Sequence, residues 1–321
     1  MSQHFLLSRA ARTLSLSKVA RMSDQEAFET FRMVRWANTG GDPVCPRCGC
    51  LTHSFLTTRR LWKCQACKHQ FSVTSGSIFA SRKMALRDIL MAVAIFVNGA
   101  KGHSALQLSR DLDCQYKTAF VLTHKLREAI SAEVATHTAS GVVEVDGAYF
   151  GGHIRPENRK EDRIDRRKAE HQTGKRSVVV VARERGGRTL SFVSKTEEAS
   201  VSVIASRIAL GSTVHADEAA GWDKLHARFL TKRINHSESY SDGEACTNQA
   251  ESFFSRLRRA EMGVHHRISG TYLGAYAGEM AWREDHRRIS NGAQYLMATN
   301  AALTHPVSRQ WIGYWQRSAN G

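Results

Sequence analysis

Two pairs of cysteines restrict what the first part of this chain can fold into. Cys45 and Cys48 form one C-x-x-C pair and Cys64 and Cys67 form a second, with fifteen residues between the pairs. Two such turns can present four thiolates to one tetrahedral ion, which is the layout of a zinc ribbon. Because four protein ligands fill the coordination sphere, the Zn²⁺ is expected to be structural and not catalytic.

Two alternatives to this four-cysteine site are open. The cysteines could be buried thiols that hold no ion, or Cys50, His53 or His69 could replace one of the four ligands. The chain has seven cysteines and no evident secretory signal, which favours metal binding over disulfides.

Three basic residues, Arg59, Arg60 and Lys63, lie between the cysteine pairs in a segment expected to form a hairpin. Their side chains could contact phosphate groups, or they could line a solvated edge. The sequence does not distinguish these two alternatives.

The charge of the whole chain indicates a polyanionic partner. The chain has 321 residues with 46 Lys and Arg against 30 Asp and Glu, and its formal net charge is +16. This excess favours nucleic acid as the partner. No apolar run is long enough to span a bilayer, so no membrane role is expected. The basic first 23 residues could be a transit peptide, but a leading helix in a cytoplasmic, nucleoid-associated protein is the favoured interpretation.

The first half of the chain has the apolar spacing of helices. Residues 24–36 show this spacing, with Asp24 as the expected N-cap. Residues 103–130 have the pattern of a helix-turn-helix, whose second helix is expected to begin at Gln115. The apolar face of its first helix is expected to comprise Ala105, Leu106 and Leu108.

Several polar residues of the second helix are candidates to reach into a major groove: Gln115, Lys117, Thr118 and His124. Two amphipathic helices also pack together in many proteins that bind no DNA. Packing alone is therefore the alternative interpretation of this segment.

The second half of the chain changes to the pattern of strands. The expected strands are 141–152, 176–184, 188–196, 212–222 and 229–237. Helices are expected at 200–210 and 247–262, the second with Phe253, Phe254 and Leu257 on its buried side. A charged stretch from Arg155 to Arg176, with nine basic and five acidic residues, is expected to be a solvated loop.

Carboxylates occur where these elements could bring them together. Asp146 lies in the first strand two residues after Glu144, so both face the same side. Asp217 lies at the end of the fourth strand, and Glu251 lies on the 247–262 helix. The three acids converge only if the two strands are neighbours and the helix packs across their ends. Shared Mg²⁺ would then neutralise them, and two ions about 3.5–4 Å apart would support in-line displacement at phosphorus.

Each carboxylate also has an ordinary structural interpretation. Asp217 could cap the following turn, with Glu218 or Asp223 as the ligand instead. Glu144 could serve only to hold a basic neighbour. The metal interpretation is favoured because the three separate acids all fall where one site would need them.

The helix of Glu251 carries further candidates. Asn248 precedes Glu251 by three residues and shares its face, so its amide could bind a metal, hold the carboxylate or cap the helix. Arg258 follows by two turns and could hold a DNA phosphate, although Glu251 could instead be a surface acid beside it. His265 and His266 could contact the strand being cut or lie in a surface loop.

Taken together, these segments resemble the DDE transposases of bacterial insertion sequences, specifically the ISXO-like group with an amino-terminal zinc ribbon. The resemblance covers nearly the whole chain. The stretches that carry it are CPRCGC…LWKCQACKHQFSVTSGSIF, VVEVDGAYFGG, VHADEAAGW and TNQAESFFSRLRRAEMGVHHRIS.

This resemblance implies an α/β fold, with a ribonuclease-H-like mixed-sheet catalytic core preceded by a zinc ribbon and a helix-turn-helix module. The expected domains are an N-terminal helical segment (1–40), the zinc ribbon (41–82), the helix-turn-helix module (83–138), the catalytic domain (139–290) and a C-terminal tail (291–321).

By position, Asp146, Asp217 and Glu251 are implied to be the catalytic acids that hold Mg²⁺ or Mn²⁺. Asn248 is implied to be the polar residue that is important at the third acidic position in some members of the group. Arg258 stands where the group commonly has Lys, which keeps the charge but changes the geometry of a phosphate contact. The residues expected to contact DNA are Arg258, Arg259, Lys117, Gln115 and His266.

The implied function is that of a DNA transposase. It would bind the terminal inverted repeats of its element, hydrolyse phosphodiesters to free 3′-OH ends and join these ends to target DNA. Its partner would be double-stranded DNA, and joining two ends would require at least a homodimer. The alternatives are a ribonuclease-H-like structure-specific nuclease or resolvase, and a non-catalytic zinc-dependent DNA-binding regulator.

Overall fold

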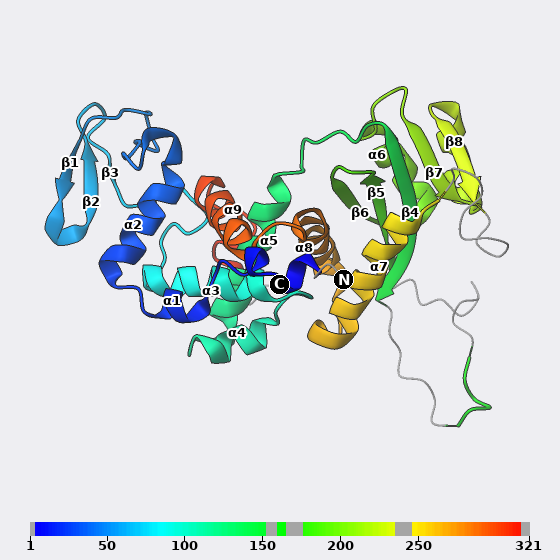
Figure 1. Cartoon of the computed structure of the whole chain (residues 1–321), viewed down its shortest axis with the longest axis horizontal. Coiled ribbons are helices and arrows are strands. Elements are labelled where there is room, and N and C mark those ends of the chain that lie inside the picture. Colours follow the sequence, from blue (N-terminus) through cyan, green and yellow to red (C-terminus); the bar gives the residue numbers. More distant parts are fainter. Residues whose placement is uncertain (1–3, 152–158, 165–175, 235–245, 316–321) are drawn as a thin grey trace. The chain divides into compact units, whose positions relative to one another are not determined.

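The computed structural model describes residues 4–151, 159–164, 176–234 and 246–315, and the chain divides into two compact units (Figure 1). Unit 1 comprises Met1–Glu133 together with His286–Gly321, and unit 2 comprises Val134–Asp285. Most of the charged stretch that was expected to form a solvated loop lies outside the described residues.

A small antiparallel sheet in unit 1 leads into the second cysteine pair, because Cys64 is the last residue of its central strand. Its strands, in order across the sheet, are β1 (His53–Leu56), β2 (Leu61–Cys64) and β3 (Gln70–Phe71). The buried Trp62 of β2 stacks on Phe71 with ring centroids 5.8 Å apart and on Phe28 at 5.5 Å. Because Phe28 belongs to α2 (Asp24–Arg35), this helix covers one face of the ribbon sheet.

Hydrogen bonds join the last residue of α2 to the segment that follows β3. The guanidinium group of Arg35 donates hydrogen bonds to the backbone oxygens of Val73 and Ser75. Burial lowers the pKa of Arg35 to about 10. The cation is thus held by carbonyl dipoles, which fix the ribbon to the helix.

Helices form the rest of unit 1. They are α1 (Leu16–Ala20), α3 (Leu86–Asn98), α4 (Ala105–Asp111), α5 (Tyr116–Ala132) and α9 (Asn291–Thr304). Helix α3 packs against α1, α2 and α9, and α5 packs against α4 and α9. Almost every residue of α3 is apolar and most are buried, which is the pattern of a helix at the centre of a bundle.

Unit 2 is built on a five-stranded mixed sheet. Its strands are β4 (Val142–Gly151), β5 (Arg176–Glu184), β6 (Thr189–Ser194), β7 (Thr213–Asp217) and β8 (Leu230–Ile234). Their order across the sheet is β6-β5-β4-β7-β8. Strands β4, β5 and β6 pair antiparallel, whereas β4, β7 and β8 pair parallel. The prediction of a mixed α/β fold is therefore confirmed.

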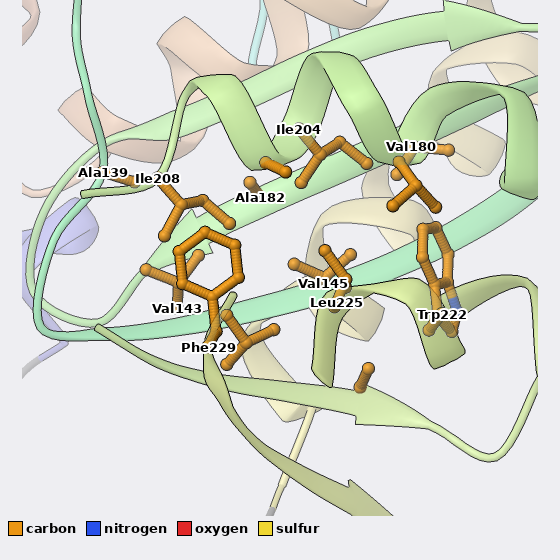
Figure 2. Close-up of a cluster of buried hydrophobic side chains, with 14 of the residues drawn as sticks. Ala139, Val143, Val145, Val180, Ala182, Ile204, Ile208, Trp222, Leu225 and Phe229 are labelled. Carbon is orange, nitrogen blue, oxygen red and sulfur yellow. The ribbon is translucent and has the colours of Figure 1, made fainter. Parts of the chain in front are cut away.

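One face of this sheet packs against α6 (Glu197–Ser206) and the 3₁₀ helix Ala220–Ala227. Figure 2 shows the core on this side, where Val145 and Val180 of the sheet meet Ile204 and Trp222. All four side chains are completely buried.

The other face packs against α7 (Asn248–Ala260) and α8 (Leu273–His286). Phe150 and Val181 of the sheet meet Phe253, Phe254 and Leu257 of α7 in this second core. The predicted buried side of the 247–262 helix is confirmed, and the helix passes into a π-helical turn at Glu261–His265.

Two local predictions in unit 1 are wrong. The N-cap of α2 is Ser23 and not Asp24: the Ser23 hydroxyl accepts from the Glu26 amide at 3.2 Å, and the Glu26 carboxylate accepts from the Ser23 amide at 2.7 Å. This capping box satisfies two amides at once, which Asp24 could not do. In α4, Leu106 is half exposed because this short helix buries the face that carries Leu108.

Within the described residues, none of the helices has both the length and the apolar content that crossing a membrane requires.

Candidate functional site

Four cysteine sulfurs meet in unit 1. The Sγ atoms of Cys45 and Cys67 lie 3.6 Å apart, as do those of Cys48 and Cys64, and all four lie within 4.8 Å of one another. These distances exclude disulfides, whose S–S bond is about 2.05 Å. They are close to the separation of about 3.8 Å that a tetrahedron of thiolates with Zn–S bonds of about 2.3 Å requires. The residues therefore fit a structural Zn²⁺.

The turns after the cysteine pairs have the geometry that metal knuckles need. Gly49 (φ +73°) and Lys68 (φ +58°) both adopt the left-handed conformation, and their amides donate to the carbonyls of Cys45 and Cys64. Hydrogen bonding by the Cys67 amide lowers the pKa of the Cys64 thiol to about 6, which favours the thiolate that zinc binds.

The alternative ligands Cys50, His53 and His69 stand outside the set of close ligand atoms in the described part of the chain. The four-cysteine set predicted from the spacing is thus the one that the structure brings together.

In unit 2 the carboxylates face the side of the sheet that α7 covers. Val145 of β4 packs in the core on the α6 side, so its neighbours Glu144 and Asp146 face α7. Ala216 of β7 also packs on the α6 side, so Asp217 faces α7 as well.

Asp146 and Asp217 occupy corresponding positions on neighbouring strands. Strands β4 and β7 are parallel and Val145 pairs with Ala216, so the next residue on each strand is one of the two acids. Neighbouring strands lie about 4.7–4.9 Å apart. The first part of the condition inferred from the sequence is met, because β4 and β7 are neighbours, whereas α7 packs against β4 and β5.

Asp217 also has the ordinary role considered for it, because its Oδ1 accepts from the amide of Ala219 at 3.2 Å and so caps the turn. Of the alternative acids, Asp223 pairs with Arg233 at 3.2 Å. Glu218 is exposed.

Glu144 is completely buried and closes the amino end of α7. Its Oε2 accepts from the backbone amides of Gln249 at 2.8 Å and Ala250 at 3.1 Å, and its Oε1 accepts from Arg185 Nε at 2.8 Å. First-turn amides lack a partner within the helix, and the helix dipole favours a negative charge there. The local N-cap residue Thr247 makes no side-chain cap, so β4 supplies the cap of α7 through Glu144.

Arg185 extends this network to β7 and to the residue that precedes the helix. Its Nη2 donates to the backbone oxygen of Cys246 at 3.1 Å and to His215 Nδ1 at 3.2 Å. The amide of Cys246 donates to the same His215 nitrogen at 3.2 Å. Burial and the charge of Arg185 lower the pKa of His215, which keeps this nitrogen an acceptor. The sequence-based view that Glu144 holds a basic neighbour is confirmed, and its capping of α7 is an addition.

The charges of three neighbouring acids, two of them predicted from the sequence, act on Asp146. Burial, together with the negative charges of Asp217, Glu251 and Glu197, raises the pKa of Asp146 to about 7. The Gly147 amide, which donates to Asp146 Oδ1 at 2.7 Å, opposes the shift. The acids therefore lie close enough to repel one another across a partly dry space.

Glu197 is an acid of this group that the sequence analysis did not single out. It begins α6, and a Cβ atom built on Gly147 would lie 2.7 Å from its Oε1, so the bare glycine leaves room for the carboxylate. Burial and the charge of Asp217 raise the pKa of Glu197. A sequence signal for this position was available in Thr196, a residue type that favours the N-cap. Thr196 is the N-cap of α6, so the helix begins at Glu197 and not at residue 200, where the apolar pattern begins.

Among the described residues, these carboxylates do not gather as tightly as the four cysteines do. Among the described residues, the four cysteines are the one set of three or more ligand atoms that all lie within 4.8 Å of one another. Two ions about 3.5–4 Å apart with Mg–O distances of about 2.0–2.1 Å allow ligands of different ions to stand up to about 8 Å apart. The oxygen donors match the preference of Mg²⁺ or Mn²⁺.

The other residues singled out on α7 are at the surface. Asn248 is exposed at the first position of the helix, and because the N-cap is Thr247, the capping role considered for Asn248 is wrong. Arg258 and Arg259 are exposed in the last turn. His266 is exposed, with a left-handed φ of +56° that non-glycine residues rarely adopt.

In unit 1, Gln115 is the exposed N-cap of α5 and makes no side-chain cap, and Lys117 is exposed with its Nζ 5.0 Å from the centre of the Trp315 ring. The candidate role of His124 is wrong. Its side chain is completely buried and stacks on Trp311 with ring centroids 4.4 Å apart, so it cannot reach a groove.

Comparison with known proteins gives matches to both parts of the chain. Residues 138–285, which include the whole mixed sheet, match the ISXO2-like transposase domain, and residues 22–70, which include the cysteine pairs, match the transposase zinc-ribbon domain. The chain is also 24% identical over 265 residues to an uncharacterized protein in the transposable element ISH50 of Halobacterium salinarum. That alignment covers 79% of this chain and 88% of the relative. With these two domains matched over more than half of its length, the chain belongs to the ISXO2-like transposases that carry a zinc ribbon.

Proposed function

We propose that this transposase binds the terminal inverted repeats of its element, hydrolyses phosphodiesters to free 3′-OH ends and joins them to target DNA. The family implies DNA as its partner. One observation carries the proposal of a site at Asp146, Asp217 and Glu251. The two aspartates occupy corresponding positions on neighbouring parallel strands, and the charge of Glu251, on the helix that packs against β4, acts on Asp146.

We further propose that unit 2 is ribonuclease-H-like and that α4 and α5 form a helix-turn-helix. The support for the first is the strand order β6-β5-β4-β7-β8 with its antiparallel and parallel halves. The support for the second is the packing of the short α4 against α5, with the amino end of α5 exposed. The domain boundaries expected from the sequence remain part of this proposal.

At the acids, bound Mg²⁺ or Mn²⁺ would supply activation of the attacking oxygen and stabilisation of the leaving oxygen in an in-line displacement. Asp146, Asp217 and Glu251 would hold these cations. Burial and the repulsion between acids raise the pKa of Asp146, and the cations would offset both effects. Asn248 would offer its amide oxygen beside Glu251. Glu144 would keep α7, and with it Glu251, in place over β4.

The DNA would be held by cations and polar groups at the surface of each unit. Arg258 and Arg259 are exposed and, within the described residues, neither forms an ion pair, so both would be available to phosphates. His266 would contact the strand near the site. Gln115 and Lys117, at the start of α5, would reach into the major groove. Synapsis of two element ends would require at least a homodimer, acting on DNA in the cytoplasm.

The proposal is tested with Asp146→Ala and a duplex that carries an element end. Cleavage and end joining are expected to be lost while binding of the end survives, because the carboxylate acts in the chemistry and not in recognition. Cleavage retained in this variant would contradict the proposal.

Two other functions give different outcomes in a joining assay that starts from a pre-cleaved end. A structure-specific nuclease or resolvase would cut DNA but would not join the supplied 3′-OH to a target. A DNA-binding regulator would do neither. The proposal requires joining that depends on a divalent cation.

A further inference from the structure

We infer that unit 1 contains a second DNA-binding surface, a groove beside the zinc ribbon that holds the phosphate backbone of duplex DNA. The groove has a volume of about 530 Å³. Its walls come from the start of α2, the turn between β1 and β2, the chain that follows β3, and the loop that leads into α3. The inference rests on DNA as the partner, and it adds a surface distinct from the one proposed on α5.

Three guanidinium groups, those of Arg59, Arg60 and Arg82, line this groove. Arg59 donates to the side-chain oxygen of Gln70 at 3.3 Å, and Arg60 donates to the backbone oxygen of Asp24 at 3.4 Å. Both acceptors are neutral. Each guanidinium has five N–H donors in a planar fork, so most donors remain available for the oxygens of a phosphate.

The third cation is held in the same manner. Arg82 donates to the backbone oxygen of Met84, and within the described residues it forms no ion pair. Burial lowers the pKa of Arg82, so the cation is partly shielded from water without a carboxylate to compensate for it. Asp24 is the one acidic residue in the lining, which leaves the groove with an excess of positive charge.

Neutral donors accompany these cations. Hydroxyl groups in the lining come from Thr57, Thr58, Ser72, Thr74 and Ser81. The lining also includes Ala85 and Leu86, where α3 begins, and this 13-residue helix has no side-chain cap at its amino end. The amides of the first turn, at the positive end of a helix, favour an anion. Arginine forks, hydroxyls and helix amides are together the groups that contact phosphates in protein–DNA interfaces.

The backbone at the groove carries local strain. Arg60 (φ +49°) and Ser81 (φ +59°) both adopt the left-handed conformation, and both line the groove. A non-glycine residue in this conformation is strained relative to glycine. The hairpin turn would form more easily with glycine at position 60, so the arginine side chain is present there at a cost to stability.

The structure also separates the three basic residues of the hairpin, which the sequence could not do. Arg59 and Arg60 line the groove, but Lys63 does not. Lys63 lies on β2 between the buried Trp62 and Cys64, so its exposed side chain is on the opposite face of that strand. It is therefore a matched control with the same charge in the same small domain.

The test is the salt dependence of binding to a short duplex of random sequence, measured by fluorescence anisotropy. Each phosphate contact contributes about 0.9 to the slope of log K against log salt concentration. The variant Arg59→Gln/Arg60→Gln/Arg82→Gln is expected to lower this slope by about 2–3 and to weaken binding equally for any sequence. Lys63→Gln is expected to keep the wild-type slope.

Two outcomes would overturn the groove: a slope in the triple variant equal to that of the wild type, or an equal fall in Lys63→Gln. Zinc content and melting temperature establish that each variant is folded. If the triple variant does not fold, Arg82→Gln alone replaces it, with an expected fall in slope of about 1. A wild-type protein that bound no DNA would contradict the proposed function as well, whereas an unaffected triple variant would contradict the groove alone.

Discussion

Glu144 and Asp146 lie two residues apart on one face of β4, yet the residues around Glu144 stabilise its charged form and those around Asp146 disfavour it. Glu144 is completely buried, but Arg185 and two helix amides stabilise its charge. Asp146 accepts a hydrogen bond from Gly147 and is surrounded by acids, and burial with their charges raises its pKa to about 7. A residue whose neighbours disfavour its charged form is costly for folding, and such residues concentrate at functional sites.

At Glu144, the variant Glu144→Gln is expected to lower the free energy of unfolding by about 2–4 kcal/mol, because Arg185 loses a buried counter-charge and the helix amides lose an anionic cap. Urea unfolding measures the change. Glu251→Gln is the matched control on the same helix, and it is expected to leave stability unchanged or to raise it by removing repulsion. A Glu144→Gln variant as stable as the wild type would show that α7 does not depend on this cap.

At Asp146, the raised pKa predicts how the stability of the metal-free protein depends on pH. The ordinary pKa of this carboxyl is 3.8 and its pKa in the fold is about 7, so between these values the folded chain holds a proton that the unfolded chain has released. Stability is therefore expected to fall as pH rises from about 4 to about 7. Melting temperatures in the presence of a chelator measure this slope. Asp146→Asn should reduce the slope, and an identical slope in both proteins would contradict the assigned cause.

At the scale of the elements, the sequence predicts those with strong local patterns. The strands of unit 2 and the buried face of α7 follow from apolar spacing, and the zinc cluster follows from cysteine spacing. What it does not predict depends on contacts between distant segments. The burial of His124 depends on Trp311, the cap of α7 comes from Glu144, and the placement of Glu197 depends on space that Gly147 leaves open. No local pattern reports such contacts.

Helix α5 has both an exposed amino end, with Lys117, and a packed face, with His124, and substitutions at these two positions are expected to have different effects. Lys117→Ala is expected to weaken DNA binding without changing the melting temperature, because its side chain is exposed. His124→Ala is expected to lower the free energy of unfolding by about 2–3 kcal/mol, because it removes a buried ring that stacks on Trp311. Binding and melting measured on both variants check the pair. Lower stability in Lys117→Ala with none in His124→Ala would reverse the assignment of the two faces.

At the scale of the whole molecule, the two units derive their stability from different sources. Unit 1 includes the metal cluster, whereas unit 2 has a core on each face of its sheet. Because structural zinc contributes directly to folding, Cys64→Ser is expected to lose zinc and to lower the melting temperature of unit 1 alone. Calorimetry with zinc analysis measures this. Cys114→Ser, outside the cluster, should change neither quantity, and an equal shift of both units in Cys64→Ser would contradict their separate origins of stability.

The measurement that tests the central claim most directly is the rate of strand joining from a pre-cleaved element end in Mg²⁺ or Mn²⁺. Asp146→Ala, Asp217→Ala and Glu251→Ala are each expected to lower this rate by roughly 10²–10³-fold or more, because each would remove a ligand of the cations. Glu218→Ala removes an exposed acid beside Asp217 and is expected to keep the wild-type rate. Joining at the wild-type rate in any one of the three variants, or an equal loss in Glu218→Ala, would contradict the claim that these three acids form the active site.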